Sequence, residues 1–371
     1  MADEISVLVV DDSALMRNLV SRMVEDTPGL VVADKAMNGR FALQKIPQVN
    51  PDIIVLDLEM PEMNGIEFLK ERKKLGLKIP VIVLSSLAAR GAEITMEALS
   101  LGASDFIQKP SGSVSHDITA VKDSLMGMLL SYGGKYRRMQ GKAVAPLTEL
   151  KPSTASPVSA APIKKPAGTA PPQQLRKPRK TEIVAIGIST GGPDALRHVF
   201  AKLDADLKVP IVVVQHMPAG FTKEFANSLS RVCPLEVKEA EDGDAVKPGR
   251  ILIARGNQHM EVEKKSFNAV VRLSDTPQVS GHRPSVDVLF ASVAIAYTSG
   301  ALGVIMTGMG RDGANQLGTI YREGGITLGQ DEASSVVYGM PRIAHEMGHV
   351  MEQVSLDNMA RRICDIAAAS R

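Results

Sequence analysis

Five polar residues suited to phosphoryl chemistry follow apolar runs in the first third of the chain. Asp11 and Asp12 come after the first run, and later runs are followed by Asp57, Ser85 and Lys109. Taken singly, Asp11 and Asp12 would be helix caps and Lys109 a surface ion-pair partner. Five such residues at successive strand ends instead indicate a crevice at the carboxyl edge of a parallel sheet.

Carboxylates that converge in one crevice repel each other unless a cation lies between them. Mg2+ takes oxygen ligands and keeps several of its waters, so it suits Asp11, Asp12 and Asp57. An aspartate beside this ion can attack a phosphoryl group and form an acyl phosphate. Ser85 and Lys109 would then bind the phosphoryl oxygens. The five residues therefore predict a phosphorylatable aspartate.

Ser189 stands in a G-x-S-x-G segment that covers residues 187–191. An apolar run precedes the segment, and Pro193 behind it suits a first helical turn. Glycines on both sides allow a sharp turn that lifts the hydroxyl above the sheet. Such a turn can also cradle a phosphate, but the P-loop lysine and the G-x-G-x-x-G spacing are missing. We expect a nucleophile here, with phosphate binding as the alternative.

A nucleophilic serine needs a base, and the base needs an orienting acid. His216 follows the next apolar run, and Asp312 lies on a glycine-rich loop after a later one. Taken alone, His216 would be a loop histidine, and Asp312 would form a turn with the glycine that follows it. Together with Ser189, they predict a catalytic triad at one sheet edge. Backbone N–H groups near Thr190 and Met309 could form its oxyanion hole.

A zinc-binding pattern occurs near the C-terminus. His345 and His349 flank Glu346 with the H-E-x-x-H spacing of zinc peptidases. However, Gly348 is a poor residue for the middle of a helix, and no third ligand follows at a recognisable spacing. We therefore expect no zinc at this segment.

Apolar runs alternate with helical patterns on both sides of a proline-rich stretch. The runs cover residues 7–10, 53–56, 81–84 and 106–107, and then 183–186, 211–214, 251–254, 302–306 and 326–328. Continuous apolar strands separated by helices indicate parallel sheets that are covered on both faces. We predict two α/β domains with doubly wound parallel sheets, the first of them flavodoxin-like.

The proline-rich stretch, residues 131–180, holds 8 prolines and 11 lysines and arginines against one acidic residue. Such a segment cannot bury enough apolar surface to fold. We therefore expect domains at 1–130 and 181–371 joined by a flexible linker. From residue 145 onward the linker has no aromatic residue for stacking on bases, which favours a solvated tether over a contact with nucleic acid or an acidic partner.

The composition favours a cytoplasmic protein. No apolar run is long enough to cross a bilayer, and the acidic N-terminus is unlike a secretory signal. The two cysteines, Cys233 and Cys364, give no disulfide framework. Cys233 precedes Pro234 without an activating neighbour, so we expect inert thiols.

Residues 5 to about 122 resemble the receiver domain of bacterial two-component response regulators. The matching segments are Val9–Ser13, Leu56–Gly65, Leu84–Ser86 and Lys109–Pro110. The resemblance implies that Asp57 is the phosphoacceptor. It also implies that Asp12, Asp57 and the backbone carbonyl of Glu59 bind Mg2+, with Asp11 in support. Phe106 stands at the aromatic switch position of the family.

Residues 181–371 closely resemble the chemotaxis protein-glutamate methylesterases, the CheB family. The matching segments are 187–192, 215–218, 281–287 and 307–314. The triad order Ser, His, Asp differs from the Ser, Asp, His order of common α/β-hydrolases. The resemblance implies Ser189 as nucleophile, His216 as base and Asp312 as its partner. Ile188 departs from the small residue expected there, without consequence for the chemistry.

The combined resemblance implies a phosphorylation-activated enzyme of chemotactic adaptation. It would hydrolyse glutamate methyl esters on the cytoplasmic helices of methyl-accepting chemoreceptors, release methanol and deamidate receptor glutamines. A chemotaxis histidine kinase would be the phosphodonor, the unphosphorylated receiver would block the esterase, and the esterase itself would need no cofactor. His282 and Arg283 are candidates for orienting the substrate, although Arg283 suits a structural ion pair equally well.

Two other output classes remain open from the receiver alone, namely a DNA-binding domain and a non-catalytic adaptor. Residues 181–371 carry a small net negative charge and show no recognition helix. We therefore expect neither nucleic-acid binding nor insertion into a membrane.

Overall fold

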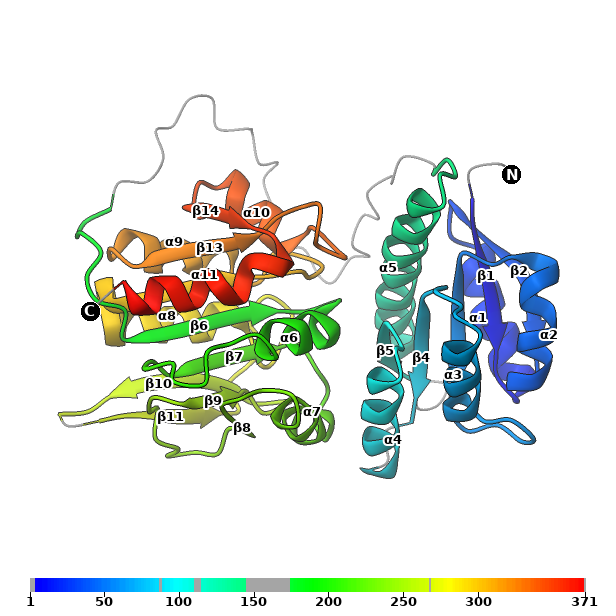
Figure 1. Ribbon diagram of the computed structural model, residues 1–371, viewed down its shortest axis with the longest axis horizontal. Helices are drawn as coiled ribbons and strands as arrows, with labels where there is room; N and C mark the ends of the chain where they lie inside the picture. The colour runs from blue at the N-terminus through cyan, green and yellow to red at the C-terminus, as the bar shows by residue number, and fades with distance from the viewer. Residues whose placement is uncertain (1–3, 87–88, 110–114, 145–173, 267, 370–371) are drawn as a thin grey trace. The chain divides into compact units, whose positions relative to one another are not determined.

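The computed structural model describes residues 4–86, 89–109, 115–144, 174–266 and 268–369. The chain divides into two compact units, each built around its own sheet (Figure 1). Both main sheets consist of parallel strands with helices between them, so the predicted pair of α/β domains is confirmed. Most of the expected linker, residues 145–173, lies outside the described residues.

The first sheet has the strand order β2-β1-β3-β4-β5. Its strands are β1 (Ile5–Val10), β2 (Leu30–Ala36), β3 (Ile53–Asp57), β4 (Val81–Ser85) and β5 (Asp105–Gln108). β3 and β4 are buried along their whole length because helices cover both faces. This strand order is that of flavodoxin-like folds, in which ligands bind where β1 and β3 end side by side.

Polar side chains cap the N-termini of the first three helices of this domain. The helices are α1 (Ala14–Glu25), α2 (Gly39–Val49), α3 (Gly65–Lys74), α4 (Ala89–Ser100) and α5 (Ser115–Met139). The Ser13 side chain accepts a hydrogen bond from the Met16 N–H and so caps α1. Asn64 and Glu67 form a capping box at α3. These caps keep the residues between strand and helix at the sheet edge.

The first domain extends beyond the boundary at residue 130 that the sequence suggested. Helix α5 continues to Met139, and Gly133 lies so close to Ile5 that a side chain at 133 would overlap it. Residues 131–139 are therefore helical and pack on the first sheet rather than belonging to the linker. The prolines that indicate the linker begin only at Pro146.

The second sheet has seven strands in the order β14-β13-β12-β6-β7-β9-β8. They are β6 (Ile183–Ile188), β7 (Ile211–Gln215), β8 (Glu236–Glu239), β9 (Arg250–Ile253), β12 (Ala301–Ile305), β13 (Ile326–Gln330) and β14 (Glu352–Val354). The antiparallel pair β10 (His259–Lys264) and β11 (Ala269–Ser274) stands apart from it. The five apolar runs of this region are its five central strands, and the short edge strands β8 and β14 were not predicted.

Helices cover both faces of the second sheet, with α11 in front and α8 behind in Figure 1. They are α6 (Gly192–Phe200), α7 (Phe221–Ser230), α8 (Val286–Tyr297), α9 (Ala314–Arg322), α10 (Met340–Glu346) and α11 (Leu356–Ala368), with a 3-10 turn at Thr298–Gly300. The Val286 side chain, at the start of α8, fills the space above Gly187 and Gly313. A side chain at either glycine would overlap it, so α8 begins in direct contact with the end of β6 and with the turn before α9.

A buried aspartate clamps the C-terminal part of α5 onto the first sheet. The Asp52 carboxylate is fully buried and accepts hydrogen bonds from the backbone and hydroxyl of Ser6 at 3.0 and 2.9 Å. Arg137 lies 2.8 Å and Lys142 3.0 Å from it. Burial acts to raise the pKa of Asp52, but these hydrogen bonds outweigh burial and lower the pKa.

We expect Asp52→Ala to destabilise the first domain by about 3–5 kcal/mol at pH 7, because it leaves Arg137 buried without its partner. The depressed pKa means that this contribution is present above the unfolded value of about 3.9 and is lost as the pH falls through the lower folded value. Urea unfolding followed by circular dichroism should therefore show a difference from wild type that shrinks in acid.

The matched control is Asp26→Ala, which removes an exposed carboxylate 3.4 Å from Lys122. An exposed pair contributes about 0–1 kcal/mol, so this variant should unfold like the wild type. Equal unfolding of the Asp52 and Asp26 variants would show that the buried clamp does not stabilise the domain.

Candidate active site and phosphorylation site

Ser189 directly follows β6 in the chain and lies on a sharp turn. Its backbone N–H donates to the carbonyl of Thr307 at 3.0 Å, and Gly191 has a φ of 82°, a left-handed conformation that suits glycine. The Gln215 side-chain amide donates to the carbonyl oxygens of Ser189 and His216, both at 3.0 Å. A side chain at Gly192 would overlap Gln215. The glycines therefore permit the turn that presents the Ser189 hydroxyl, as the sequence predicted.

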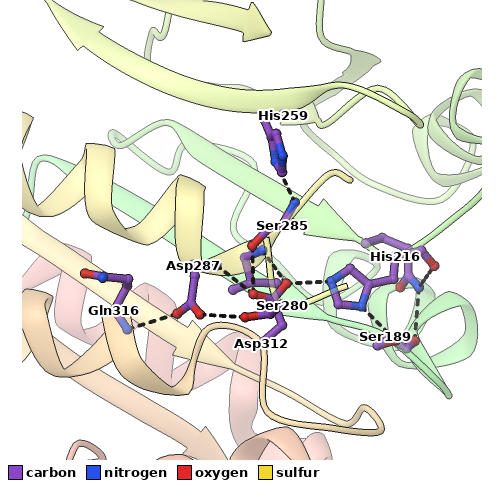
Figure 2. A network of polar contacts seen from close by, with 10 residues as sticks. Ser189, His216, His259, Ser280, Ser285, Asp287, Asp312 and Gln316 are labelled. Atoms are coloured by element: carbon purple, nitrogen blue, oxygen red, sulfur yellow. Dashed lines mark hydrogen bonds and ion pairs between the residues drawn. The ribbon is translucent and has the colours of Figure 1, made fainter. Parts of the chain in front are cut away.

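Ser189, His216 and Asp312 form one continuous chain of hydrogen bonds (Figure 2). His216 follows β7, the neighbour of β6, and its Nδ1 lies 3.1 Å from Ser189 Oγ. Its Nε2 lies 2.8 Å from Asp312 Oδ2. An ionised carboxylate can only accept, so Nε2 carries the proton and Nδ1 is left to accept from the serine hydroxyl. The structure thus brings together the three residues that the sequence placed at strand ends.

The Asp312 carboxylate is almost completely buried at the N-terminus of α8. Oδ1 accepts from the Ser285 hydroxyl at 2.7 Å and from the Asp287 N–H at 3.1 Å, while Oδ2 accepts from the Val286 N–H at 2.7 Å. Burial acts to raise the pKa of Asp312, but hydrogen bonds from His216, Ser285 and Val286 outweigh it and lower the pKa. The residue is therefore held as an anion beside His216.

Ser285 was not among the residues that the sequence singled out for the site. It is fully buried, and its N–H donates to His259 Nδ1 at 3.2 Å while its hydroxyl donates to Asp312. His259 Nε2 lies 3.1 Å from the carbonyl of Pro277 and donates to it. The only signal in the sequence was that Ser285 falls in segment 281–287, which carries part of the family resemblance.

The His282 ring stacks on the His216 ring, with centroids 3.8 Å apart and an interplanar angle of 14°. Burial, reinforced by the nearby His216, lowers the pKa of His282 to about 4. At neutral pH the His282 ring is therefore uncharged, and it lies flat against one face of the His216 ring. The prediction that His282 orients the substrate stays a prediction.

Arg283 is engaged with neighbouring loops. Its Nε and one terminal nitrogen donate to Asn257 Oδ1 at 3.2 and 2.8 Å. The other terminal nitrogen donates to the carbonyl oxygens of Asp275 and Thr276 at 2.8 and 3.1 Å. All of these acceptors are neutral, so these contacts give Arg283 a structural role but are not the ion pair that the sequence suggested.

The loop after β12 runs closely past Ser189. A side chain at Gly308 would come within 2.8 Å of Ser189 Cβ, so this close approach needs glycine. The Thr190 and Met309 N–H groups lie on the two loops involved, and neither donates a hydrogen bond to another residue in the described part of the chain. They remain the predicted donors to an oxyanion.

The zinc-like pattern does not form a site in the structure. Helix α10 ends at Glu346, and Gly348 has a φ of 74°, so His345 and His349 do not share a helical face. His345 is exposed, whereas His349 is buried with Nδ1 2.8 Å from the carbonyl of Ala314.

Asp11, Asp12 and Asp57 converge at the carboxyl edge of the first sheet. One carboxylate oxygen of each lies within 4.8 Å of the others. Lys109 Nζ lies 2.7 Å from Asp57 and 3.1 Å from Asp11. Burial raises the pKa of Asp57, with the Asp11 charge adding to it and Lys109 opposing. Burial acts to lower the pKa of Lys109, but its contacts with Asp57 and Asp11 raise it.

Of the other residues expected to support phosphorylation, Glu59 contacts this cluster, and Ser85 and Phe106 lie on β4 and β5. The Glu59 N–H donates to Asp57 Oδ1 at 3.2 Å. Ser85 and Phe106 are both buried, and the Ser85 hydroxyl lies 2.6 Å from that of Thr95. Three carboxylates with hard oxygen donors and one neighbouring cation fit a divalent ion such as Mg2+.

The two sites are those of a phosphorylatable receiver and of a serine hydrolase. Residues 7–117 match the model of the response regulator receiver domain, and residues 184–363 match that of the CheB methylesterase. The chain belongs to the CheB family, in which a receiver precedes a methylesterase domain. The resemblance recognised in the sequence is thereby confirmed.

Named relatives cover nearly the whole chain. The protein-glutamate methylesterase/protein-glutamine glutaminase of Treponema denticola is 62% identical over 97% of this chain and 98% of its own. The protein of the same name from Treponema pallidum is 50% identical over 97% of this chain and 96% of its own. The Thermotoga maritima CheB methylesterase catalytic domain aligns with a TM-score of 0.50 and 36% identity, over 50% of this chain and 99% of that structure.

Two further observations concern membrane-spanning helices and the two cysteine thiols. No helix in the described ranges has the length and apolar character needed to cross a membrane. Cys233 is partly buried and Cys364 buried, and burial raises the pKa of both thiols. These are the properties of thiols that do not act as nucleophiles.

We expect His282→Ala to lower kcat about 3- to 10-fold. The variant removes the ring that stacks on His216 and so fixes the orientation of the His216 ring, and stacked rings contribute about 0.5–1.5 kcal/mol. His282→Phe should keep most of the activity because it restores a flat apolar face. The measurement is methanol release from a methylated receptor fragment, with His198→Ala, a histidine on α6 that pairs with Asp357, as control. If phenylalanine were as damaging as alanine, an imidazole nitrogen of His282 would be needed.

Proposed function

We propose that this chain is a cytoplasmic enzyme of chemotactic adaptation that hydrolyses glutamate methyl esters on chemoreceptors and is activated by phosphorylation. The observation that carries the proposal is the unbroken hydrogen-bond chain from Ser189 Oγ through His216 to Asp312. The Treponema relatives are named for the same esterase activity. A DNA-binding output, the runner-up, has no support in a domain of the methylesterase family.

The geometry supports hydrolysis through an acyl-enzyme. Ser189 Oγ gives its proton to His216 Nδ1 and attacks the side-chain ester carbonyl. Asp312 stabilises the imidazolium that forms, because its carboxylate accepts from Nε2. The Thr190 and Met309 N–H groups donate to the oxyanion. His216 then passes the proton to the methoxide that leaves, methanol departs, and an ester between Ser189 and the glutamyl carbonyl remains.

Water completes the reaction by the reverse sequence. His216 Nδ1 takes a proton from the attacking water and returns it to Ser189 Oγ, so that a glutamate carboxylate is released. The same steps act on a glutamine side chain, with ammonia as the leaving group. This second activity agrees with the glutaminase half of the relatives' names. We propose that the chain has both activities.

The substrate is proposed to be a side chain on the cytoplasmic helices of methyl-accepting chemoreceptors. We propose that His282, whose ring stacks on His216, contacts such a side chain. Arg283 contributes indirectly, by holding the loop that carries His282. The esterase chemistry uses the side chains of this domain alone, so we propose that it needs no cofactor.

The receiver is proposed to control the esterase through phosphorylation of Asp57 by a chemotaxis histidine kinase. Asp11, Asp12, Asp57 and the Glu59 carbonyl would hold Mg2+, which neutralises charge at the phosphoryl group. Ser85 and Lys109 would bind the phosphoryl oxygens, and Phe106 would turn inward as they move. The unphosphorylated receiver is proposed to restrain the esterase.

Ser189→Ala should reduce kcat by several orders of magnitude, on the order of 10^3–10^6, with little change in KM. The loss follows because, among the described residues, Ser189 supplies the hydroxyl that is hydrogen-bonded to His216 Nδ1 and no other hydroxyl contacts this atom. The assay is methanol release from a methylated receptor cytoplasmic fragment. Ser228→Ala removes a buried serine whose hydroxyl accepts a hydrogen bond from Arg197 on α6, and this variant should be as active as wild type. Near-normal turnover of the Ser189 variant would exclude it as nucleophile.

Asp57→Ala should leave the basal esterase rate unchanged and abolish activation by a small phosphodonor such as acetyl phosphate. Chelation of Mg2+ should have the same effect on the wild type, since phosphorylation needs the ion. Asp34→Ala, which removes a carboxylate that pairs with Lys45, is the control and should still be activated. Full activation of the Asp57 variant would place the phosphoacceptor elsewhere.

A further inference from the structure

Helices α8 and α9 cap each other with carboxylates. Neither the α8 N-cap, Ser285, nor the α9 N-cap, Gly313, makes a side-chain cap of its own helix. Instead Asp312, just before α9, accepts from the first two N–H groups of α8. Asp287, in the first turn of α8, accepts from the Gln316 N–H in the first turn of α9 at 3.1 Å. Figure 2 shows Asp287 and Asp312 in this network.

The crossed caps sit in a tightly packed place. Asp312 is 1% exposed and Asp287 is 7% exposed. Val286 directly precedes Asp287 in the chain and fills the space that a side chain at Gly313 would need. The second oxygen of Asp287 accepts from the Ser280 hydroxyl at 3.2 Å. The turn that carries Asp312 therefore has little room to move unless Asp287 is displaced.

Capping two helices with buried carboxylates costs free energy. Serine, threonine or asparagine would cap either helix without charge. Two buried carboxylates repel each other, and burial together with the Asp312 charge raises the pKa of Asp287. Helix stability alone therefore does not account for an aspartate at 287. The effect particular to Asp287 is that its hydrogen bond fixes the first turn of α9 against α8. This also fixes Asp312, which lies just before α9.

We propose that Asp287 is a positioning residue for the hydrolysis, acting through Asp312. By capping α9 it fixes the turn at residues 312–313, so that Asp312 Oδ2 stays 2.8 Å from His216 Nε2. The proposal rests on the triad of the proposed function. Among the described residues, the Asp287 carboxylate accepts from Ser280 and Gln316, and its N–H donates to Asp312. None of these hydrogen bonds reaches Ser189 or His216.

The test is a double-mutant cycle in the full-length protein with Asp287→Ala, Asp312→Ala and the combination. We expect Asp287→Ala to lower kcat roughly 10- to 100-fold, as loss of a residue that orients a site residue does, with KM within about threefold. In the Asp312→Ala background the same change should alter kcat by less than about threefold, because the group it positions is gone.

Two conservative variants separate geometry from charge. Asp287→Asn keeps an acceptor oxygen at the same reach and should retain kcat within about fivefold. Asp287→Glu keeps the charge but lengthens the side chain, and it should lose nearly as much as alanine. If Asp287→Ala failed to fold, the cycle would be run with Asp287→Glu. Asp244→Ala is the matched control, since Asp244 is a largely buried carboxylate bonded to the Glu241 N–H and Lys238. It should leave kcat unchanged.

The outcomes are distinct. An equal loss on changing Asp287 in both backgrounds would overturn the proposal in favour of a general structural role. An unchanged kcat in Asp287→Ala would overturn it as well, as would an asparagine variant no better than alanine. If Asp312→Ala itself had wild-type kcat, the proposed triad would fail, which is a different result from failure of the positioning role.

Discussion

The buried negative charge of Asp312 is the constraint on which the second domain's site depends. A carboxylate with 1% exposure must be compensated within the protein, and here four donors converge on it: His216, the Ser285 hydroxyl and two backbone N–H groups. Two of these donors exist only because α8 begins at this point, and the helix dipole adds to them. The close approach of the α8 N-terminus to Asp312 requires glycine at positions 187 and 313, because a side chain at either position would overlap Val286. The catalytic geometry and the choice of glycines thus follow from one charge.

The phosphorylation site of the receiver surrounds its buried aspartate differently. The donors around Asp312 lower its pKa, whereas Asp57 has a raised pKa with Lys109 as its cationic neighbour. A carboxylate held by four donors is a fixed partner for His216 and a poor nucleophile. Asp57 faces two other carboxylates and a single lysine, so it binds a cation and attacks a phosphoryl group more readily than such a carboxylate would. The number of donors around each aspartate therefore matches the chemistry proposed for it.

Much of the fold could be predicted because buried parallel strands leave continuous apolar runs, such as Ile211–Val214. The short edge strands β8 and β14 leave no such run, since half-exposed strands contain residues such as Glu236 and Glu352. Helix faces were less certain. Leu15 fits a four-residue apolar repeat with Leu19 and Met23, yet it is 78% exposed at the start of α1. The end of the first domain was misplaced because α5 continues into a segment that resembles the linker in charge.

The triad could be predicted because Ser189, His216 and Asp312 all follow strands, and strands of one sheet end together. Ser285 and Asp287 could not, because their contribution depends on where a helix starts in space relative to a loop about 25 residues away. No local pattern in the sequence encodes how close the α8 N-terminus comes to Asp312, and two of the donors involved are backbone N–H groups that any residue except proline would supply. Side-chain motifs therefore indicate which residues react. The residues that hold them in place become visible only once the helices are placed around the charge they must neutralise.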